Sequence, residues 1–149
     1  MFRDPQKIEA SKFAVELLMP VDMFCQLMAQ APLDYTLINS LARQFRVSKH
    51  ASGNRILEFT RDSCIIIRTS VFNITDRRTS QAAKRHLLPL VQIPHGTAAF
   101  QAISNKKNQI DFTECDPAKW LTKTNAVFRL YEYTRGDWEH CVATTILKW

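Results

Sequence analysis

Glycine is scarce in this sequence, which has three glycines among its 149 residues. A glycine-rich phosphate-binding loop or a nucleophile elbow needs several glycines close together, so neither kind of site is expected. Long apolar runs are also missing, because Ile65-Ile66-Ile67 is far shorter than the ~20 residues of a transmembrane helix. The N-terminal segment has charged residues and no apolar stretch typical of a signal peptide. We therefore expect a cytoplasmic protein with no membrane association.

The four cysteines do not form a known motif. They stand at positions 25, 64, 115 and 141, with no Cys-x-x-Cys pair and no histidine at metal-ligand spacing. This pattern excludes zinc-finger and thioredoxin motifs. We expect the cysteines to be free thiols that pack as small apolar residues in a reducing compartment.

The charge balance is basic and uneven. Lys and Arg number 20 against 14 Asp and Glu, a formal net charge of +6. Such a bias favours an acidic partner, for example nucleic acid, and the alternative is an ordinary solvated surface. The stretch 77–107 contains no acidic residue and six basic ones, which are Arg77, Arg78, Lys84, Arg85, Lys106 and Lys107.

The first part of the chain predicts helices. Ala10, Phe13, Ala14 and Leu17 recur at three- and four-residue steps, which indicates a helix over 6–19 that ends before Pro20. A second helix is expected over 22–30, with Asp22 as its N-cap.

Residues 36–59 predict a helix-turn-helix-like unit. Its first helix carries an apolar stripe at Ile38, Leu41, Ala42 and Phe45, and Ser48 is the expected N-cap of a second helix that ends near Phe59.

The second part of the chain predicts a small sheet with one or two helices. β-Branched runs indicate strands near 64–67 and 71–74, and alternating residues indicate strands over 127–133 and 138–147, joined by a hairpin turn at 134–137. A short basic helix is expected over 79–86, an interrupted extended segment over 87–93, and a helix capped by Thr97. The fold class is α+β: a helical portion over 1–62, followed by a small mixed α/β sheet portion over 63–149.

Two segments of the helical portion carry a family resemblance. Residues 9–20 read Glu-Ala-Ser-Lys-Phe-Ala-Val-Glu-Leu-Leu-Met-Pro, and residues 41–48 read Leu-Ala-Arg-Gln-Phe-Arg-Val-Ser. They resemble the second active-site helix and the helix-turn-helix-like stretch of the ImmA/IrrE family of zinc-dependent endopeptidases. The family usually has Asn where this chain has Ser11, and Arg55-Ile56-Leu57 lies where it commonly has Arg-Leu.

The resemblance implies one zinc ligand in this chain, and the motif that would supply the other ligands is absent. In that family a His-Glu-x-x-His helix supplies two zinc ligands and the general base, and the next helix supplies a glutamate, whose place is taken here by Glu9. The histidines stand at 50, 86, 95 and 140, so no two are four residues apart and the motif is absent. We expect no bound zinc and no peptidase activity. Glu16, two turns beyond Glu9, is interpreted as a surface or packing residue.

These observations predict a truncated or degenerate ImmA/IrrE-like protein that acts in regulation. The family's members cleave helix-turn-helix repressors of phage, mobile-element or stress-response circuits in bacteria, so the resemblance implies a helix-turn-helix repressor, or the missing peptidase half, as the protein partner. Without the neighbouring His-bearing helix, the face around Phe13 and Leu17 is expected to be uncovered and open to a partner or to self-association.

Two alternatives belong to other functional classes. One is a DNA-binding regulatory module that uses the helix-turn-helix-like unit, since Asn and Arg side chains pair with base edges and basic residues contact phosphates. Its candidate residues are Arg43, Arg46, Lys49, Asn54 and Arg55. The other alternative is an effector-sensing domain built on the C-terminal sheet.

Overall fold

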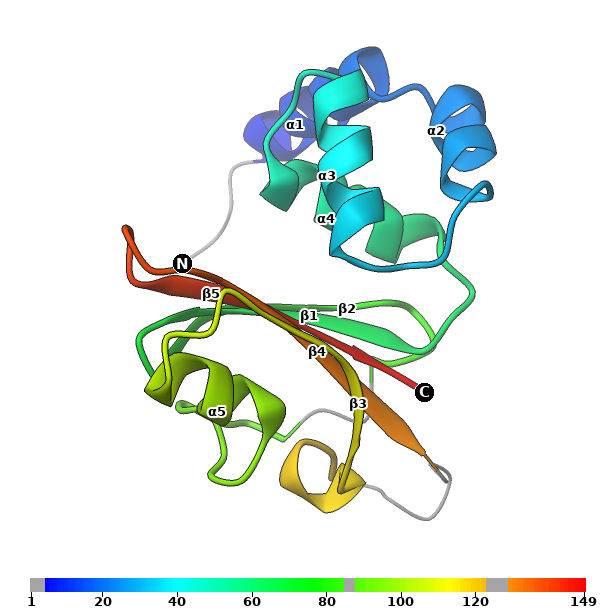
Figure 1. The fold of residues 1–149 in the computed structure, drawn as a ribbon. Coiled ribbons are helices and arrows are strands. Elements are labelled where there is room, and N and C mark those ends of the chain that lie inside the picture. The colour runs from blue at the N-terminus through cyan, green and yellow to red at the C-terminus, as the bar shows by residue number, and fades with distance from the viewer. Residues whose placement is uncertain (1–4, 85–87, 123–128) are drawn as a thin grey trace. The chain divides into compact units, whose positions relative to one another are not determined.

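The structure is a computed structural model that describes residues 5–84, 88–122 and 129–149. The chain divides into two compact units, Met1–Ile56 and Leu57–Trp149. Helices dominate the first unit and a five-stranded sheet the second, which confirms the predicted α+β class (Figure 1). In the described part of the chain, no helix is long and apolar enough to cross a membrane.

Four helices occupy the N-terminal part of the chain. They are α1 (Pro5–Leu18), α2 (Val21–Met28), α3 (Tyr35–Gln44) and α4 (Lys49–Phe59). The predicted N-cap Ser48 is confirmed, because its hydroxyl accepts a hydrogen bond from the Ala51 N–H at 3.0 Å. The prediction for Asp22 is wrong: α2 begins one residue earlier and has Pro20 at its N-cap position, so Asp22 lies in the first turn.

The core of the first unit forms around α3. The predicted stripe is confirmed at Ile38, Leu41 and Ala42, which are buried, and the ring of Phe45 packs on that of Phe24 at 5.5 Å between centroids. The other buried apolar residues of this unit are Met19, Leu33, Leu37 and Ile56. The amphipathic pattern of α3 thus gives the short helices a common apolar surface to pack on.

The second unit is built on an antiparallel sheet. Its strands are β1 (Cys64–Ser70), β2 (Asn73–Thr79), β3 (Gln109–Cys115), β4 (Leu130–Asp137) and β5 (Val142–Lys148). Their order across the sheet is β2-β1-β5-β4-β3, and all four pairings are antiparallel. Helix α5 (Ala98–Ser104) packs against β3, β4 and β5 and covers one sheet face (Figure 1). A 3-10 turn, η1 (Pro117–Lys119), follows β3.

The face of the sheet toward α5 holds the main apolar core of this unit. Alternate residues of the strands point to that side, as the two-residue period of a strand requires. The cluster combines strand residues with Ala99 and Ile103 of α5 and the fully buried Trp120. Its strand residues are Ile65, Ile67, Leu130, Ala143 and Leu147.

Two expectations for the second unit are wrong, and a third is confirmed. The hairpin turn lies at residues 138–141, not 134–137, which belong to β4. The expected helix over 79–86 does not form where it is described, since Thr79 ends β2 and residues 81–84 make a turn, while residues 85–86 lie outside the described chain. The expectation of an interrupted extended segment over 87–93 is confirmed where it is described, because residues 88–93 make one isolated bridge, between Gln92 and Asn73 of the edge strand β2.

Candidate functional site

Glu9, the residue that matches a metal ligand, lies exposed in the second turn of α1. Within the part of the chain that the structure describes, no three His, Cys, Asp or Glu side chains are grouped so that they could hold a metal ion. His50 lies beside Asn54, the ring of His95 packs on Phe100, and His140 contacts Asp137. The described residues therefore do not fit the zinc centre that the resemblance implies.

Glu16 binds a residue from the other end of the first unit. Its carboxylate accepts a hydrogen bond from the Arg55 guanidinium at 2.7 Å, and the same Nη2 atom donates to the Met19 main-chain oxygen at 3.1 Å. Arg55 is 2% exposed, whereas the Glu16 side chain is 52% exposed. The pair ties α1 to α4, and the bond to Met19 satisfies a carbonyl just after the end of α1. Arg55 thus has a packing role that its sequence position did not indicate.

One side of α1 carries uncovered apolar residues. Phe13 is 70% exposed, Leu17 69% and Leu18 54%, and Ala10 and Ala14 between them are also exposed. Their three- and four-residue spacing places them on one side of the helix. These five residues are called the α1 face below. Large apolar side chains that are exposed side by side on one helix are typical of an interaction surface.

The helix-turn-helix-like unit is formed by α3 and α4. The Ser52 hydroxyl, buried in α4, donates to the Ile38 carbonyl oxygen of α3 at 3.1 Å and holds the two helices close together. Of the five residues considered for DNA binding, Arg43, Arg46 and Lys49 are exposed. Asn54 is half-buried beside His50, and Arg55 is buried. The structure therefore brings three cations to the surface around the α3–α4 turn and turns Arg55 inward.

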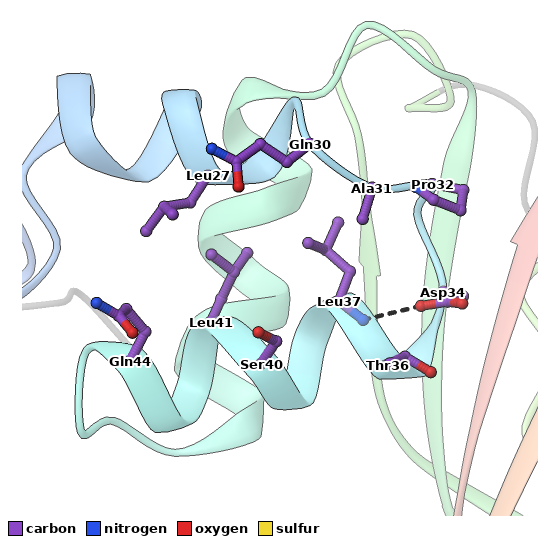
Figure 2. A pocket seen from close by; sticks show the side chains of 10 residues that line it. All are labelled: Leu27, Gln30, Ala31, Pro32, Asp34, Thr36, Leu37, Ser40, Leu41 and Gln44. Atoms are coloured by element: carbon purple, nitrogen blue, oxygen red, sulfur yellow. Dashed lines mark hydrogen bonds between the residues drawn. The ribbon is translucent and has the colours of Figure 1, made fainter.

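A cavity of about 430 Å³ opens between the end of α2 and α3 (Figure 2). Leucine side chains of both helices point into it, and uncharged polar side chains stand around them. The Asp34 carboxylate at one end accepts a hydrogen bond from the Leu37 N–H at 2.8 Å and so caps α3. We call this space the α2–α3 cavity; its main lining residues are Leu27, Gln30, Leu37, Ser40, Leu41 and Gln44.

The second unit contains a buried carboxylate, Glu132 of β4. Its two oxygens accept hydrogen bonds from the first main-chain N–H groups of α5, those of Ala98 at 3.0 Å and Ala99 at 2.6 Å. Burial raises the pKa of Glu132 above its ordinary value, and these N–H groups act in the opposite direction. Because Thr97 accepts the next N–H, that of Phe100, Glu132 completes the capping of α5. We therefore assign Glu132 a structural role.

The cysteines are free thiols and differ in exposure. Cys64 is buried, and burial raises its pKa to about 12. Burial, together with the charge of Glu132, also raises the pKa of Cys115 to about 12. Such thiols remain protonated at neutral pH and are poor nucleophiles. The expectation that the cysteines pack as buried apolar residues is confirmed for Cys64 and wrong for the exposed Cys141, while Cys25 and Cys115 are half-buried.

Sequence reasoning missed two features of the first unit, the Glu16–Arg55 pair and the α2–α3 cavity. The cavity residues lie in two segments with a Pro-containing turn between them, and no motif marks them. The pair joins residues 39 positions apart, and only the coincidence of an acid and a base on separate predicted helices suggests it. Compared with models of known protein families and with curated proteins, the chain matches none.

Proposed function

We propose that the chain is a recognition module that binds a regulatory protein partner through the α1 face and has no peptidase activity of its own. The observation that carries the proposal is the exposure of Phe13 and Leu17, at 70% and 69%, on a helix that the Glu16–Arg55 pair holds to α4. Apolar residues spaced by three and four positions on a rigid helix are a common means of docking into an apolar groove.

The proposed partner is a helix-turn-helix repressor. This part of the proposal rests on the resemblance of residues 9–20 and 41–48 to the ImmA/IrrE family, whose members act on such repressors. Glu9 is the position that matches a metal ligand in that family, and here it lies one helical turn before Phe13. In this proposal Glu9 borders the recognition surface.

The proposal is tested by calorimetric titration of the purified chain with a purified helix-turn-helix repressor encoded beside its gene. We expect micromolar binding that Leu17→Asp abolishes, because the substitution places a charge in the centre of the α1 face. Val91→Asp is the matched control, since Val91 is 74% exposed in the second unit. Equal binding by both variants, or no binding by the wild-type chain, would contradict the proposal.

The absence of peptidase activity is tested in the same mixtures. The repressor is incubated with the chain and added zinc, and its mass is then measured. We expect an intact repressor. Cleavage that is lost in Glu9→Ala would show that the chain has a working metal site and would overturn this part of the proposal.

DNA binding is the second candidate function. It is favoured by the exposure of Arg43, Arg46 and Lys49 around the α3–α4 turn, where cations would meet phosphates. A salt-dependent shift of duplex DNA that weakens in Arg43→Ala and Lys49→Ala supports this candidate. No shift at low salt eliminates it.

A further inference from the structure

The α2–α3 cavity has the size of a binding site, with an apolar floor and a polar rim. Its volume of about 430 Å³ lies within the range of small-ligand sites, roughly 300–1,000 Å³. Leu37 and Leu41 are buried and form an apolar floor, and Leu27 of α2 faces them (Figure 2). Gln30, Ser40 and Gln44 around them are exposed. An apolar group can therefore enter between the leucines while polar groups remain at the rim.

The nearly uncharged lining of the cavity favours an uncharged ligand. Asp34 is the one charged residue among the ten that line the cavity, and its carboxylate already accepts the Leu37 N–H. A cationic or anionic group placed on the leucine floor would lose its hydration without gaining an ion pair. The cavity thus favours a neutral, apolar occupant.

The two glutamines at the rim match a peptide group. Within the described chain, the side-chain amides of Gln30 and Gln44 make no hydrogen bond; Gln30 lies in the turn after α2, and Gln44 ends α3. Each amide offers two N–H donors and one carbonyl acceptor, the same types of group that a peptide main chain presents in return. An apolar side chain with a peptide group on either side can use the floor and the rim together.

We propose that the α2–α3 cavity binds a leucine-sized side chain of a peptide, with the adjoining main chain held by the amides of Gln30 and Gln44. A peptide fits better than a compact small molecule because the rim is exposed, so only the side chain needs to be enclosed. This inference is independent of the proposed function, since no residue of α1 lines the cavity.

The test uses blocked amino acids and the methyl NMR signals of Leu27, Leu37 and Leu41 in the full chain. N-acetyl-leucine N-methylamide is expected to shift these signals with a Kd of about 1 mM, as befits a ligand of its size. The aspartate analogue tests the requirement for a neutral side chain, and isopentanol tests the requirement for peptide groups. We expect at least tenfold weaker binding of both.

Two variants link the binding to this cavity. Gln44→Ala should weaken binding of the leucine probe about fivefold through loss of one hydrogen bond. Gln26→Ala, an exposed glutamine of α2 outside the cavity, should leave binding unchanged. Ser40→Trp should block the mouth and abolish binding. Failure of the leucine probe to shift these methyl signals, equal binding of isopentanol, or unchanged binding in both Gln44→Ala and Ser40→Trp would overturn the proposal. Leu17→Asp, which tests the proposed function, should have no effect here.

Discussion

The Arg55 guanidinium lies 2.7 Å from the Glu16 carboxylate and fixes α1 against α4 within the first unit. Arg55 is almost completely buried, and Glu16 is half exposed, so the two partners contribute differently to stability. Removing Arg55 loses its bond to Met19 and its packing as well as the ion pair. Removing Glu16 leaves a buried cation with one fewer acceptor.

Arg55→Ala should therefore lower the free energy of unfolding by about 3 kcal/mol. Arg55→Lys should lower the free energy of unfolding by about half as much. The ammonium group keeps the positive charge, but it binds the two acceptors less well than the guanidinium does. Urea unfolding followed by circular dichroism measures the change. Arg43→Ala, which alters an exposed residue of α3, is the matched control, with an expected effect within about 0.5 kcal/mol. An Arg55→Ala effect as small as that of the control would contradict the packing role.

Glu132 predicts a pH dependence of stability. Burial raises its pKa in the folded state above the unfolded value of about 4.3, so the folded protein retains this proton to higher pH. The contribution of this group to the free energy of unfolding is therefore fully present below about pH 4.3 and is lost as the pH rises through the folded pKa. Thermal or urea unfolding across this range should show the decline in the wild-type protein.

Glu132→Gln should flatten that decline, because the amide does not titrate. It should leave stability at low pH nearly unchanged, because the protonated carboxyl group of Glu132, like the amide, has one carbonyl oxygen for the N–H groups of Ala98 and Ala99. Glu114→Gln, at an exposed position of β3, is the control and should change neither quantity appreciably. An identical pH slope in the wild type and in Glu132→Gln would show that Glu132 does not cause the dependence.

The ends of α3 and α5 offer a stabilising substitution. In both, a basic residue just past the helix adopts a left-handed conformation, Arg46 with φ 54° and Lys106 with φ 49°. The following N–H, of Val47 or Lys107, bonds back to Ala42 or Ala102 at 2.9 Å, which completes a Schellman motif.

Arg46→Gly and Lys106→Gly should each raise the free energy of unfolding by about 1 kcal/mol, since glycine enters the left-handed region without the steric cost of a side chain. Arg43→Gly, within α3, should instead lower it by about 1 kcal/mol. Urea unfolding compares the three variants. A loss of stability in Arg46→Gly would mean that the arginine side chain makes a contact worth more than the backbone strain.

The sequence predicts local features of this fold well and the placement of polar partners poorly. Ser48 and Thr97 are confirmed as helix caps, because a cap depends on residues within one turn. The hairpin turn was expected at 134–137 because this segment is rich in turn-forming residues, and that prediction is wrong. Gly136 in fact lies in β4, where a Cβ atom would clash with the ring of Trp138, so the glycine serves close packing.

Other features depend on contacts between distant residues. Strand β3 was not expected because five of its seven residues are exposed, so it shows no apolar alternation. The burial of Arg55 follows from where α1 and α4 meet, which no local pattern encodes. In contrast, the exposure of Phe13 and Leu17 was expected and is confirmed, at 70% and 69%.

Site-specific photocross-linking tests the central claim, partner recognition by the α1 face, most directly. A photoreactive phenylalanine analogue replaces Phe13 in one preparation and Val91 in another, and each is irradiated with the purified helix-turn-helix repressor. We expect a covalent adduct with the repressor from position 13 and none from position 91. Adducts from position 91 alone, or a repressor that binds the chain without any adduct from position 13, would contradict it.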